Sequence, residues 1–363
     1  MENNTIGAIV GGPSASGSAV TFTVPDPDHE FAAVRLHQEI RRPRNGPDFG
    51  YDEGAGAWIL DFPLPGADRM EYLVEIVHGG GTSEAGPDPH QDLRAPGAFG
   101  DKSVVVMPGY ETPAWVGETA VAEGSLRAIE LRCRAVRGRV PCLVWSPPGA
   151  EDDQPLPLLV VNDGPEFGNY SSLRHFFEVL MPQGRLPRFR AALLAPVDRD
   201  EIYSASATYA RSLVGEMMPE LLRIAPTPPG RNSRIGMGAS LGALSMLYTH
   251  RRSPATFGAL YLQSGSFFRT RFDKQESGFP RFRRISRFVG EVLTAEDWAL
   301  PIPVVMTCGL VEENLANNRA VRAALGRQGY DVSLVENRDG HNWIGWRDTF
   351  DPHLVALIER MWT

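Results

Sequence analysis

The residues most suited to chemistry lie in the pentapeptide Gly238-Ala239-Ser240-Leu241-Gly242. This is the G-x-S-x-G pattern, which places a serine on a sharp turn between a strand and a helix. Glycine two positions before and after the serine avoids the clash that a side chain would cause in so tight a turn. The flanking segments favour a strand at 233–237 and a helix at 241–247, as this turn requires. We interpret Ser240 as a nucleophile; the alternative is an ordinary Gly/Ser turn.

A serine nucleophile needs a general base, and the usual chain order places that histidine after the serine and the acid. His250 lies in the helix that leaves the turn, about 15 Å along it. His353 falls in a C-terminal helical segment. His341 directly follows the last predicted strand, at the carboxyl edge of the sheet where Ser240 is also expected. We predict that His341 is the base; the alternative is a structural loop histidine.

The acid that orients the histidine should follow the preceding strand, where Glu312 and Glu313 are adjacent. Only one of these neighbouring carboxylates can face the imidazole well. Asp339 is closer in sequence, but its place two residues before His341 on the same loop gives it a poor geometry for Nδ1. Glu312 is favoured over Glu313. The alternative for the pair is a solvated helix start, where carboxylates suit the helix dipole.

An oxyanion hole would use the backbone N–H of Leu241, the residue after the nucleophile. The second donor is expected in the loop at 162–167, which follows a predicted strand. Pro165 has no N–H, so this donor is either Gly164 or Glu166. The residues alone leave the choice open, and the loop could also be a simple turn.

Apolar runs alternate with helical patterns over 126–363, which predicts an α/β fold with a mostly parallel sheet and helices on both faces. Two opening runs, at 129–136 and 140–145, predict an antiparallel hairpin at the edge of that sheet. Further strands are expected at 157–161, 191–197, 234–237, 258–262, 303–308 and 331–336. Helices are expected at 173–180, 209–224, 241–251 and 317–328.

Residues 1–125 have a different pattern. Short apolar runs at 19–24, 57–62, 71–77 and 103–107 are separated by Gly, Pro and Asp clusters, which predicts a smaller β-sandwich. The charge also differs, because residues 1–125 hold 19 acidic and 7 basic residues (net −12) whereas 126–363 hold 25 and 29 (net +4). We therefore predict two domains, 1–125 and 126–363.

The composition excludes several classes of protein. With 42% hydrophobic and 22% charged residues, the 363-residue chain is globular. A net charge of −8 disfavours nucleic-acid partners, and no apolar run is long enough to predict a membrane span. Met1–Thr5 does not open a secretory signal. Cys133, Cys142 and Cys308 are an odd number without metal-ligand spacing, which indicates a reducing compartment and predicts a cytoplasmic location.

Together these residues resemble the enterochelin esterase family of serine α/β-hydrolases, within a group that includes feruloyl esterases and mycolyltransferases. The matching motifs are 87–90 with 96–104, 113–115, Asp163-Gly164, 216–219, the turn at Ser240, Gly309-x-x-Glu312 and 340–347. The resemblance implies an immunoglobulin-like leading domain before an α/β-hydrolase domain. In the family the acid stands three residues after a strand-ending glycine, which supports Glu312. No metal or organic cofactor is implied.

Substrate contacts are expected at four positions. After Asp-Gly the family commonly carries Gln and an aromatic residue, where this chain has Pro165 followed by Glu166 and Phe167. Trp343 belongs to the histidine motif, and Arg269 opens the segment 269–287, which has seven basic and two acidic residues. Such a segment would attract an anionic ester such as a ferric catecholate, or form a solvated helix face.

The sequence therefore predicts a carboxylic-ester hydrolase that forms an acyl-enzyme with a small-molecule ester, of the siderophore type or another bulky kind. One alternative is an acyltransferase with the same triad, in which an alcohol replaces water. Another is a carbohydrate-binding protein with an inactive hydrolase domain. No membrane partner is expected, and the oligomeric state is not predicted.

Overall fold

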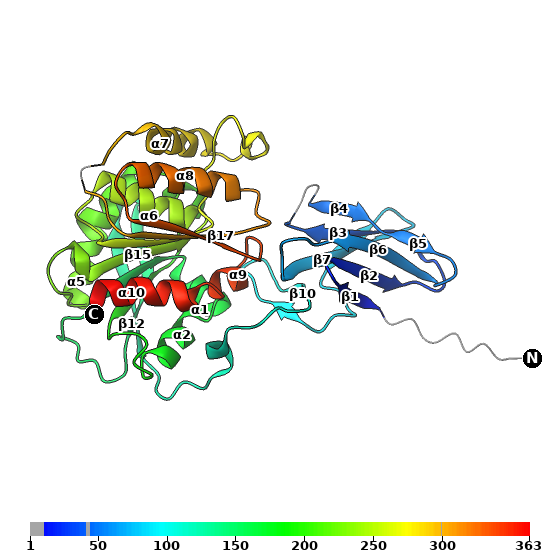
Figure 1. Ribbon diagram of the computed structural model, residues 1–363, viewed down its shortest axis with the longest axis horizontal. Coiled ribbons are helices and arrows are strands. Elements are labelled where there is room, and N and C mark those ends of the chain that lie inside the picture. The colour runs from blue at the N-terminus through cyan, green and yellow to red at the C-terminus, as the bar shows by residue number, and fades with distance from the viewer. Residues whose placement is uncertain (1–10, 41–43, 299) are drawn as a thin grey trace, which may run out of the picture. The chain divides into compact units, whose positions relative to one another are not determined.

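The computed structural model describes residues 11–40, 44–298 and 300–363, and the chain forms two compact units (Figure 1). The N-terminal unit extends to Glu111 and includes two short later segments, Leu310–Glu313 and Arg338–Asn342. The C-terminal unit holds the remainder of the chain from Thr112. Met1–Thr5, from which the absence of a secretory signal is predicted, lies outside the described residues.

Short antiparallel strands build the N-terminal unit. Within the described residues, one sheet has the order β1-β2-β6-β5 and the other the order β4-β3-β7-β10-β9, with β8 paired to β7. The bounds are β1 Gly12–Ser16, β2 Ala19–Pro25, β3 Phe31–Gln38, β4 Asn45–Asp48, β5 Gly50–Asp52, β6 Ala57–Pro63, β7 Arg69–His78, β8 Ser83–Gly86, β9 Arg94–Ala95 and β10 Lys102–Val106.

A shared core explains the alternation of apolar and polar residues in these strands. Val20, Phe22 and Val24 of β2 are buried, and the residues between them are partly exposed. Tyr72 and Val74 of β7, from the other sheet, belong to the same apolar cluster. Apolar side chains from both sheets thus meet in one core, which makes this unit a β-sandwich.

The two later segments make specific contacts within the N-terminal unit. The N–H of Asp68, just before β7, donates to the carbonyl of Arg338 at 2.8 Å, and Arg338 Nε donates to the Asp68 carboxylate at 2.7 Å. Arg44 Nη2 lies 3.4 Å from Glu313 Oε2. The β-sandwich therefore holds two loops that the sequence pattern assigns to the later part of the chain.

The division between the units lies ahead of the boundary predicted at residue 125. Residues 112–125 belong to the C-terminal unit. The physical reason is Trp115 in the 3-10 helix η1 (Ala114–Gly117), which is buried in an apolar cluster with Trp145 and Phe176.

A mixed sheet lies at the centre of the C-terminal unit, in the order β11-β12-β14-β13-β15-β16-β17-β18. β12 is antiparallel to both β11 and β14, and the other neighbouring pairs are parallel. The bounds are β11 Ser125–Cys133, β12 Gly138–Ser146, β13 Leu158–Asn162, β14 Arg190–Leu194, β15 Arg234–Ala239, β16 Ala259–Gln263, β17 Val304–Gly309 and β18 Val332–Asn337. The predicted mostly parallel sheet with an antiparallel hairpin at its edge is confirmed.

Helices cover both faces of this sheet (Figure 1). Their bounds are α1 Gly164–Tyr170, α2 Leu173–Leu180, α3 Arg199–Ile202, α4 Ala207–Ser212, α5 Met218–Ile224, α6 Leu241–Arg252, α7 Phe282–Thr294, α8 Leu315–Arg327, α9 Trp343–Arg347 and α10 Val355–Trp362. The shorter η helices are η2 Arg134–Val136, η3 Leu213–Met217, η4 Arg231–Ser233, η5 Lys274–Glu276 and η6 Phe350–Leu354. Val160 of β13 packs in the cluster that contains α4 to α8, and the next residue, Val161, packs in the cluster that contains α1, α2 and α10. Both faces of the strand are therefore apolar, as its continuous hydrophobic run predicts.

Two elements differ locally from the sequence prediction. The first hairpin strand ends at Cys133 rather than at residue 136, because η2 forms a turn and Arg137 follows it with φ of +53°. The helix predicted at 209–224 consists of α4, the π-helix η3 and α5 in direct succession. Among the described helices, none combines the length and apolar composition needed to cross a bilayer.

Candidate active site

Ser240 occupies the turn between β15 and α6, and its backbone conformation is unusual. Its φ is +56° and its ψ is −122°, a region that residues with a side chain rarely adopt. A Cβ on Gly238 would lie 2.6 Å from the carbonyl carbon of Gly242, and a Cβ on Gly242 would lie 3.0 Å from Asp163 Oδ2. The close approach of β15 and α6 therefore requires glycine at 238, and a side chain at 242 would crowd the Asp163 carboxylate, as the G-x-S-x-G pattern predicts.

The segment that follows β16 also holds the turn. The N–H of Ser240 donates to the carbonyl of Gln263 at 2.9 Å, and the N–H of Ser266 donates to the carbonyl of Ser240 at 3.1 Å. The hydroxyl oxygens of Ser240 and Ser266 are 3.0 Å apart and share a hydrogen bond. Ser266 was not among the sequence-based candidates. The signal that could have found it is its position just beyond the carboxyl end of a strand next to β15.

His341 is hydrogen-bonded to Glu312 within the N-terminal unit. Its Nδ1 lies 2.7 Å from Glu312 Oε2, and the Glu312 side chain is only 1% exposed. Glu313 instead faces Arg44. When Nδ1–H donates to a carboxylate, the neutral ring has its proton acceptor at Nε2, as a general base requires. The structure thus brings His341 together with Glu312, whereas the carboxylate of Glu313 faces Arg44.

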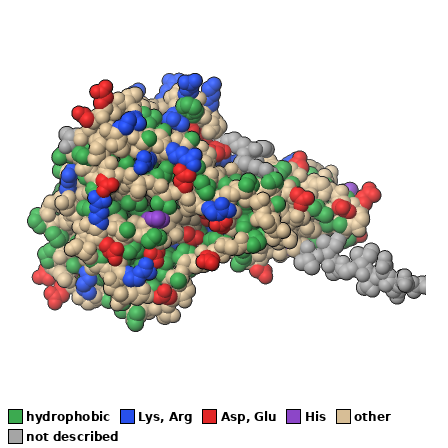
Figure 2. Space-filling view, viewed as in Figure 1, with side chains coloured by type: hydrophobic (Ala, Val, Ile, Leu, Met, Phe, Trp, Pro, Cys, Tyr) green, Lys and Arg blue, Asp and Glu red, His purple; other side chains and the backbone are tan. Residues whose placement is uncertain are grey.

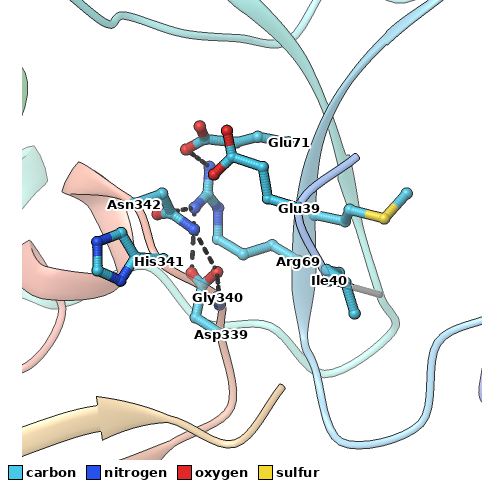
Figure 3. A pocket seen from close by; sticks show the side chains of 9 residues that line it. Glu39, Ile40, Arg69, Glu71, Asp339, Gly340, His341 and Asn342 are labelled. Carbon is cyan, nitrogen blue, oxygen red and sulfur yellow. Dashed lines mark hydrogen bonds and ion pairs between the residues drawn. The ribbon is translucent and has the colours of Figure 1, made fainter. Parts of the chain in front are cut away.

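Asp339, the other acid considered for this role, has different partners (Figure 3). Its Oδ2 accepts from Arg69 Nη1 at 3.0 Å. Its Oδ1 accepts from the N–H of Gly340 at 2.6 Å and from Asn342 Nδ2 at 2.7 Å. Asp339 therefore stabilises the loop on both sides of His341 instead of orienting the ring. Arg69 was not a sequence-based candidate, and its distance from His341 along the chain left no local signal for it.

His250, which the sequence analysis set aside as base, is a structural residue. It is fully buried in α6, and its Nε2 lies 3.0 Å from the Tyr330 hydroxyl. Burial lowers the pKa of His250 to about 3, with Arg231 and Arg251 adding to the effect. The imidazole is therefore neutral at ordinary pH.

The predicted oxyanion donors lie at the starts of two helices. Leu241 is the first residue of α6 and Gly164 the first residue of α1, and N–H groups of a first helical turn have no intrahelical acceptor. A Cβ on Gly164 would lie 2.2 Å from Leu193 Cα, so the close packing of α1 on β14 requires glycine here. Asp163, just before Gly164, accepts from Arg199 Nε at 2.9 Å and from Arg199 Nη2 at 3.0 Å. This ion pair holds Asp163, the residue that directly precedes α1, in place.

Glu166 also lies in the first turn of α1, and its carboxylate is unusual. Its Oε2 is buried, with no hydrogen-bond partner among the described residues. Burial raises the pKa of Glu166, and the charge of Asp163 raises it further. The side chain remains a candidate for substrate contact, as does the backbone N–H for the oxyanion hole.

The aromatic candidates have separate roles in the C-terminal unit. Phe167 is fully buried, and its ring contacts Trp343, Trp346 and Phe350. The prediction that Phe167 touches substrate is therefore corrected to a packing role in the core. The Trp343 ring is only partly buried, and it packs edge-on against Trp346 with centroids 4.8 Å apart.

Arg269 and the basic segment lie after β16 and extend into α7. Arg269 Nε donates to Asn317 Oδ1 at 2.5 Å, and its guanidinium lies 4.1 Å from the ring centroid of Phe272. Arg281 and Arg284 form ion pairs with Glu201. The other basic side chains of the segment, on Arg271, Lys274, Arg283 and Arg287, are exposed. Figure 2 shows Lys and Arg side chains gathered at the upper edge of the C-terminal unit, where α7 lies in Figure 1.

The chain is similar in sequence to known esterases over about half of its length. No family model matches the chain. The iron(III) enterobactin esterase of Dickeya dadantii is 26% identical over 216 residues, which cover 56% of this chain and 48% of the relative. The iron(III) enterobactin esterase of Escherichia coli O6:H1 is 23% identical over 205 residues, covering 55% and 49%. The chain spans about half the length of the curated relatives it matches.

Solved structures match over nearly the whole chain. An enterobactin esterase of Shigella flexneri, solved in the presence of enterobactin, has a TM-score of 0.75 at 19% identity, with 96% of each chain covered. The ferric enterobactin esterase of Salmonella typhimurium has a TM-score of 0.77 at 20% identity, covering 96% of this chain and 97% of that one. The resemblance to enterobactin esterases is confirmed. A ferulic acid esterase matches 66% of this chain with a TM-score of 0.56 at 15% identity. At these identities the solved structures establish the α/β fold.

Proposed function

We propose that this chain is a carboxylic-ester hydrolase in which Ser240, His341 and Glu312 form a catalytic triad. The observation that carries the proposal is the conformation of Ser240, whose positive φ between β15 and α6 is the strained turn of a serine nucleophile. Ser172, by contrast, combines a φ of +52° with a ψ of +31°, which is the ordinary left-handed region, whereas the ψ of Ser240 is −122°. The hydrogen bond between His341 and Glu312 supports the other two roles.

The topology of the sheet supports the same assignment. The segments that carry Glu312 and His341 follow the carboxyl ends of β17 and β18, and the turn at Ser240 follows the carboxyl end of β15. These strands are parallel and belong to one sheet, so their carboxyl ends share one edge. Active sites of open α/β sheets lie at that edge.

The residues would act in two steps. In the first, Ser240 Oγ bonds to the ester carbonyl carbon while His341 Nε2 takes the hydroxyl proton; the C–O bond then breaks and the proton passes to the leaving alcohol. In the second, water attacks the acyl-enzyme, gives its proton to His341 and releases the acid, and Ser240 regains a proton. Glu312 stabilises the imidazolium in both steps. The N–H of Leu241, with that of Gly164 or Glu166, would bind the oxyanion.

We further propose that the substrate is a bulky anionic ester of the siderophore type. The names of the curated relatives support this class, since both are iron(III) enterobactin esterases. The exposed basic side chains before and on α7 also support it, because clustered cations attract an anion. Iron would arrive with the substrate and is not needed for the triad chemistry.

The proposal also covers the leading domain, the division into domains and the location of the protein. The two antiparallel sheets around one core support an immunoglobulin-like sandwich for the leading domain. Two domains and a cytoplasmic location rest on the sequence pattern, with the domain boundary placed at residue 112 rather than residue 125 because Trp115 is buried with the later part of the chain.

Hydrolysis of a p-nitrophenyl ester tests the proposed function. Ser240→Ala should lower kcat/KM by at least about 10³-fold without unfolding the protein, because the nucleophile is lost. Ser245→Ala is the matched control, since Ser245 is a buried serine on α6, the helix that begins directly after Ser240, and the proposed mechanism gives it no role. It should keep activity within about tenfold of the parent. Parent-like activity in Ser240→Ala would rule out the triad.

A further inference from the structure

Arg69 is a buried arginine at the start of β7, and two of the partners drawn in Figure 3, Asp339 and Asn342, lie on the loop that carries His341. Its side chain is only 3% exposed. Nη1 donates to Asp339 Oδ2 at 3.0 Å and to Asn342 Oδ1 at 2.8 Å. Nη2 donates to Glu71 Oε1 at 3.0 Å. A planar guanidinium makes these contacts from two nitrogens held in a fixed fork, a geometry that the single nitrogen of a lysine lacks.

The contacts fix the residues on both sides of His341. Asp339 holds Gly340 through its N–H, and it holds Asn342 through the side-chain amide. The N–H of Asn342 also donates to the carbonyl of Gly340 at 3.1 Å, which closes the turn around His341. Arg69 bonds to both ends of this turn, so its position sets the position of the backbone that carries the imidazole.

Burial makes Arg69 hard to replace in this cluster. Burial raises the pKa of Asp339, and the positive charge of Arg69 opposes that rise. Burial likewise raises the pKa of Glu71, with Arg69 and Lys102 opposing it. Removing the guanidinium would leave two buried carboxyl groups without their main counter-ion, so the loop would rearrange to reach water or other donors.

The space beside these groups argues against a direct contact between Arg69 and substrate. The pocket beside these groups is lined by Glu39, Ile40, Arg69, Met70, Glu71, Asp339, Gly340, His341 and Asn342. It has a volume of about 10 Å³. That is about the room needed for a single water molecule. An organic ester does not fit there, so Arg69 does not contact the substrate in this pocket, and its hydrogen bonds to Asp339 and Asn342 offer a route through the loop.

We propose that Arg69 is a positioning residue, which holds the loop 339–342 so that His341 keeps its hydrogen bond to Glu312 and its alignment for proton transfer. The inference rests on the proposed function, because it assigns Arg69 a role only if His341 is the base. It gives the N-terminal β-sandwich a part in catalysis, although none of its strands supplies a residue of the proposed triad.

Kinetics on a small neutral ester separate positioning from binding. Arg69→Met should lower kcat by about 10²-fold, the size of loss that a misplacement of about 1 Å can cause, and leave KM within about threefold. Arg69→Lys keeps the charge but loses the fork, so its kcat should lie between those of Arg69→Met and the parent. All assays are run at a temperature at which circular dichroism shows each variant folded.

A matched control separates positioning from a general loss of stability. Arg190, the first residue of β14, is as buried as Arg69, at 2% exposure, but its side chain donates to the Ser146 hydroxyl and to three backbone carbonyls of the segments 151–154 and 226. Arg190→Met should lower the melting temperature and leave the kcat of the folded protein within about threefold of the parent. A loss of kcat in Arg190→Met equal to that in Arg69→Met would overturn the positioning role.

A double-mutant cycle tests the route through the loop. If Arg69 acts through Asp339, then Arg69→Met should lower kcat far less in an Asp339→Asn background than in the parent. Additive losses would mean that Arg69 acts by another route, and the inference would be wrong. If Arg69→Met does not fold, the same comparison is made with Arg69→Lys, Asp339→Asn and the variant that has both substitutions.

Ser240→Ala shows which proposal has failed. If Ser240→Ala is inactive and both Arg69 variants match the parent in kcat, only the positioning role is wrong. If Ser240→Ala is as active as the parent, the proposed function is wrong and the positioning role is lost with it.

Discussion

Glu312 and Glu313 are adjacent and chemically identical, yet their surroundings give them different roles. Glu312 is buried against His341 Nδ1, whereas Glu313 is partly exposed and faces Arg44. An exposed ion pair of this kind contributes little to stability. A carboxylate held 2.7 Å from an imidazole can keep the ring in one tautomer and stabilise its protonated form.

Glutamine substitutions separate these roles. Glu312→Gln should lower kcat by at least about 10²-fold, because a neutral amide stabilises the imidazolium poorly and can impose the wrong tautomer. Glu313→Gln is the matched control and should lower kcat by less than about tenfold. The measurement is kcat on a p-nitrophenyl ester for both variants. The opposite ranking would assign the acid to Glu313.

The sequence predicted those candidate catalytic residues that lie in a recognisable local motif or directly after a predicted strand. Ser240 lies in a pentapeptide with a steric reason for each glycine, and His341 follows a strand end. Ser266 and Arg69 have no such pattern, because their contacts depend on how distant segments pack. Phe167 shows the converse, since its place in an expected substrate loop did not reveal that its side chain turns into the core.

The turn between β15 and α6 is the element on which the candidate site depends most. Gly238→Ala should lower the free energy of unfolding by about 1–3 kcal/mol, because its Cβ would overlap the backbone of Gly242. Gly290→Ala on α7 is the control, since no atom lies within 4 Å of its added Cβ. It should be neutral or stabilising by up to about 1 kcal/mol. Urea unfolding of both variants provides the comparison, and equal stabilities would contradict the tight approach.

Elements with a strong internal pattern could be predicted, and those defined by pairing could not. The helix predicted at 173–180 has the bounds of α2, and the apolar runs of the large sheet all form strands. β8 is short and mostly exposed and β9 has only two residues, so neither has a pattern of its own and only their partner strands define them. The segments 310–313 and 338–342 belong to the N-terminal unit through contacts with residues far away in sequence, which no local pattern reports.

At the scale of the whole molecule, charge is distributed unevenly. No ion pair of Arg283 or Arg287 is seen among the described residues, and both side chains are exposed on α7. Their long-range field is therefore free to act on an anionic ester. That field weakens when salt shortens the Debye length, whereas buried hydrogen bonds hardly change.

Salt dependence tests this role of the basic segment. Between about 0.05 and 0.5 M salt, kcat/KM should fall several-fold for an anionic ester and stay constant for a neutral one. Arg283→Ala with Arg287→Ala should abolish the difference. Arg360→Ala, on α10 across the sheet from α7, should preserve it. The same salt dependence for both esters would make the segment an ordinary solvated helix face.

Covalent labelling by a fluorophosphonate tests directly whether Ser240 is the nucleophile. Such a probe phosphonylates a serine only when a base activates it, so it reports the nucleophile without knowledge of the natural ester. Intact-mass spectrometry of the parent should show one adduct, peptide mapping should place it on Ser240, and Ser240→Ala should remain unlabelled. An adduct on another residue, or equal labelling of Ser240→Ala, would mean that Ser240 is not the nucleophile.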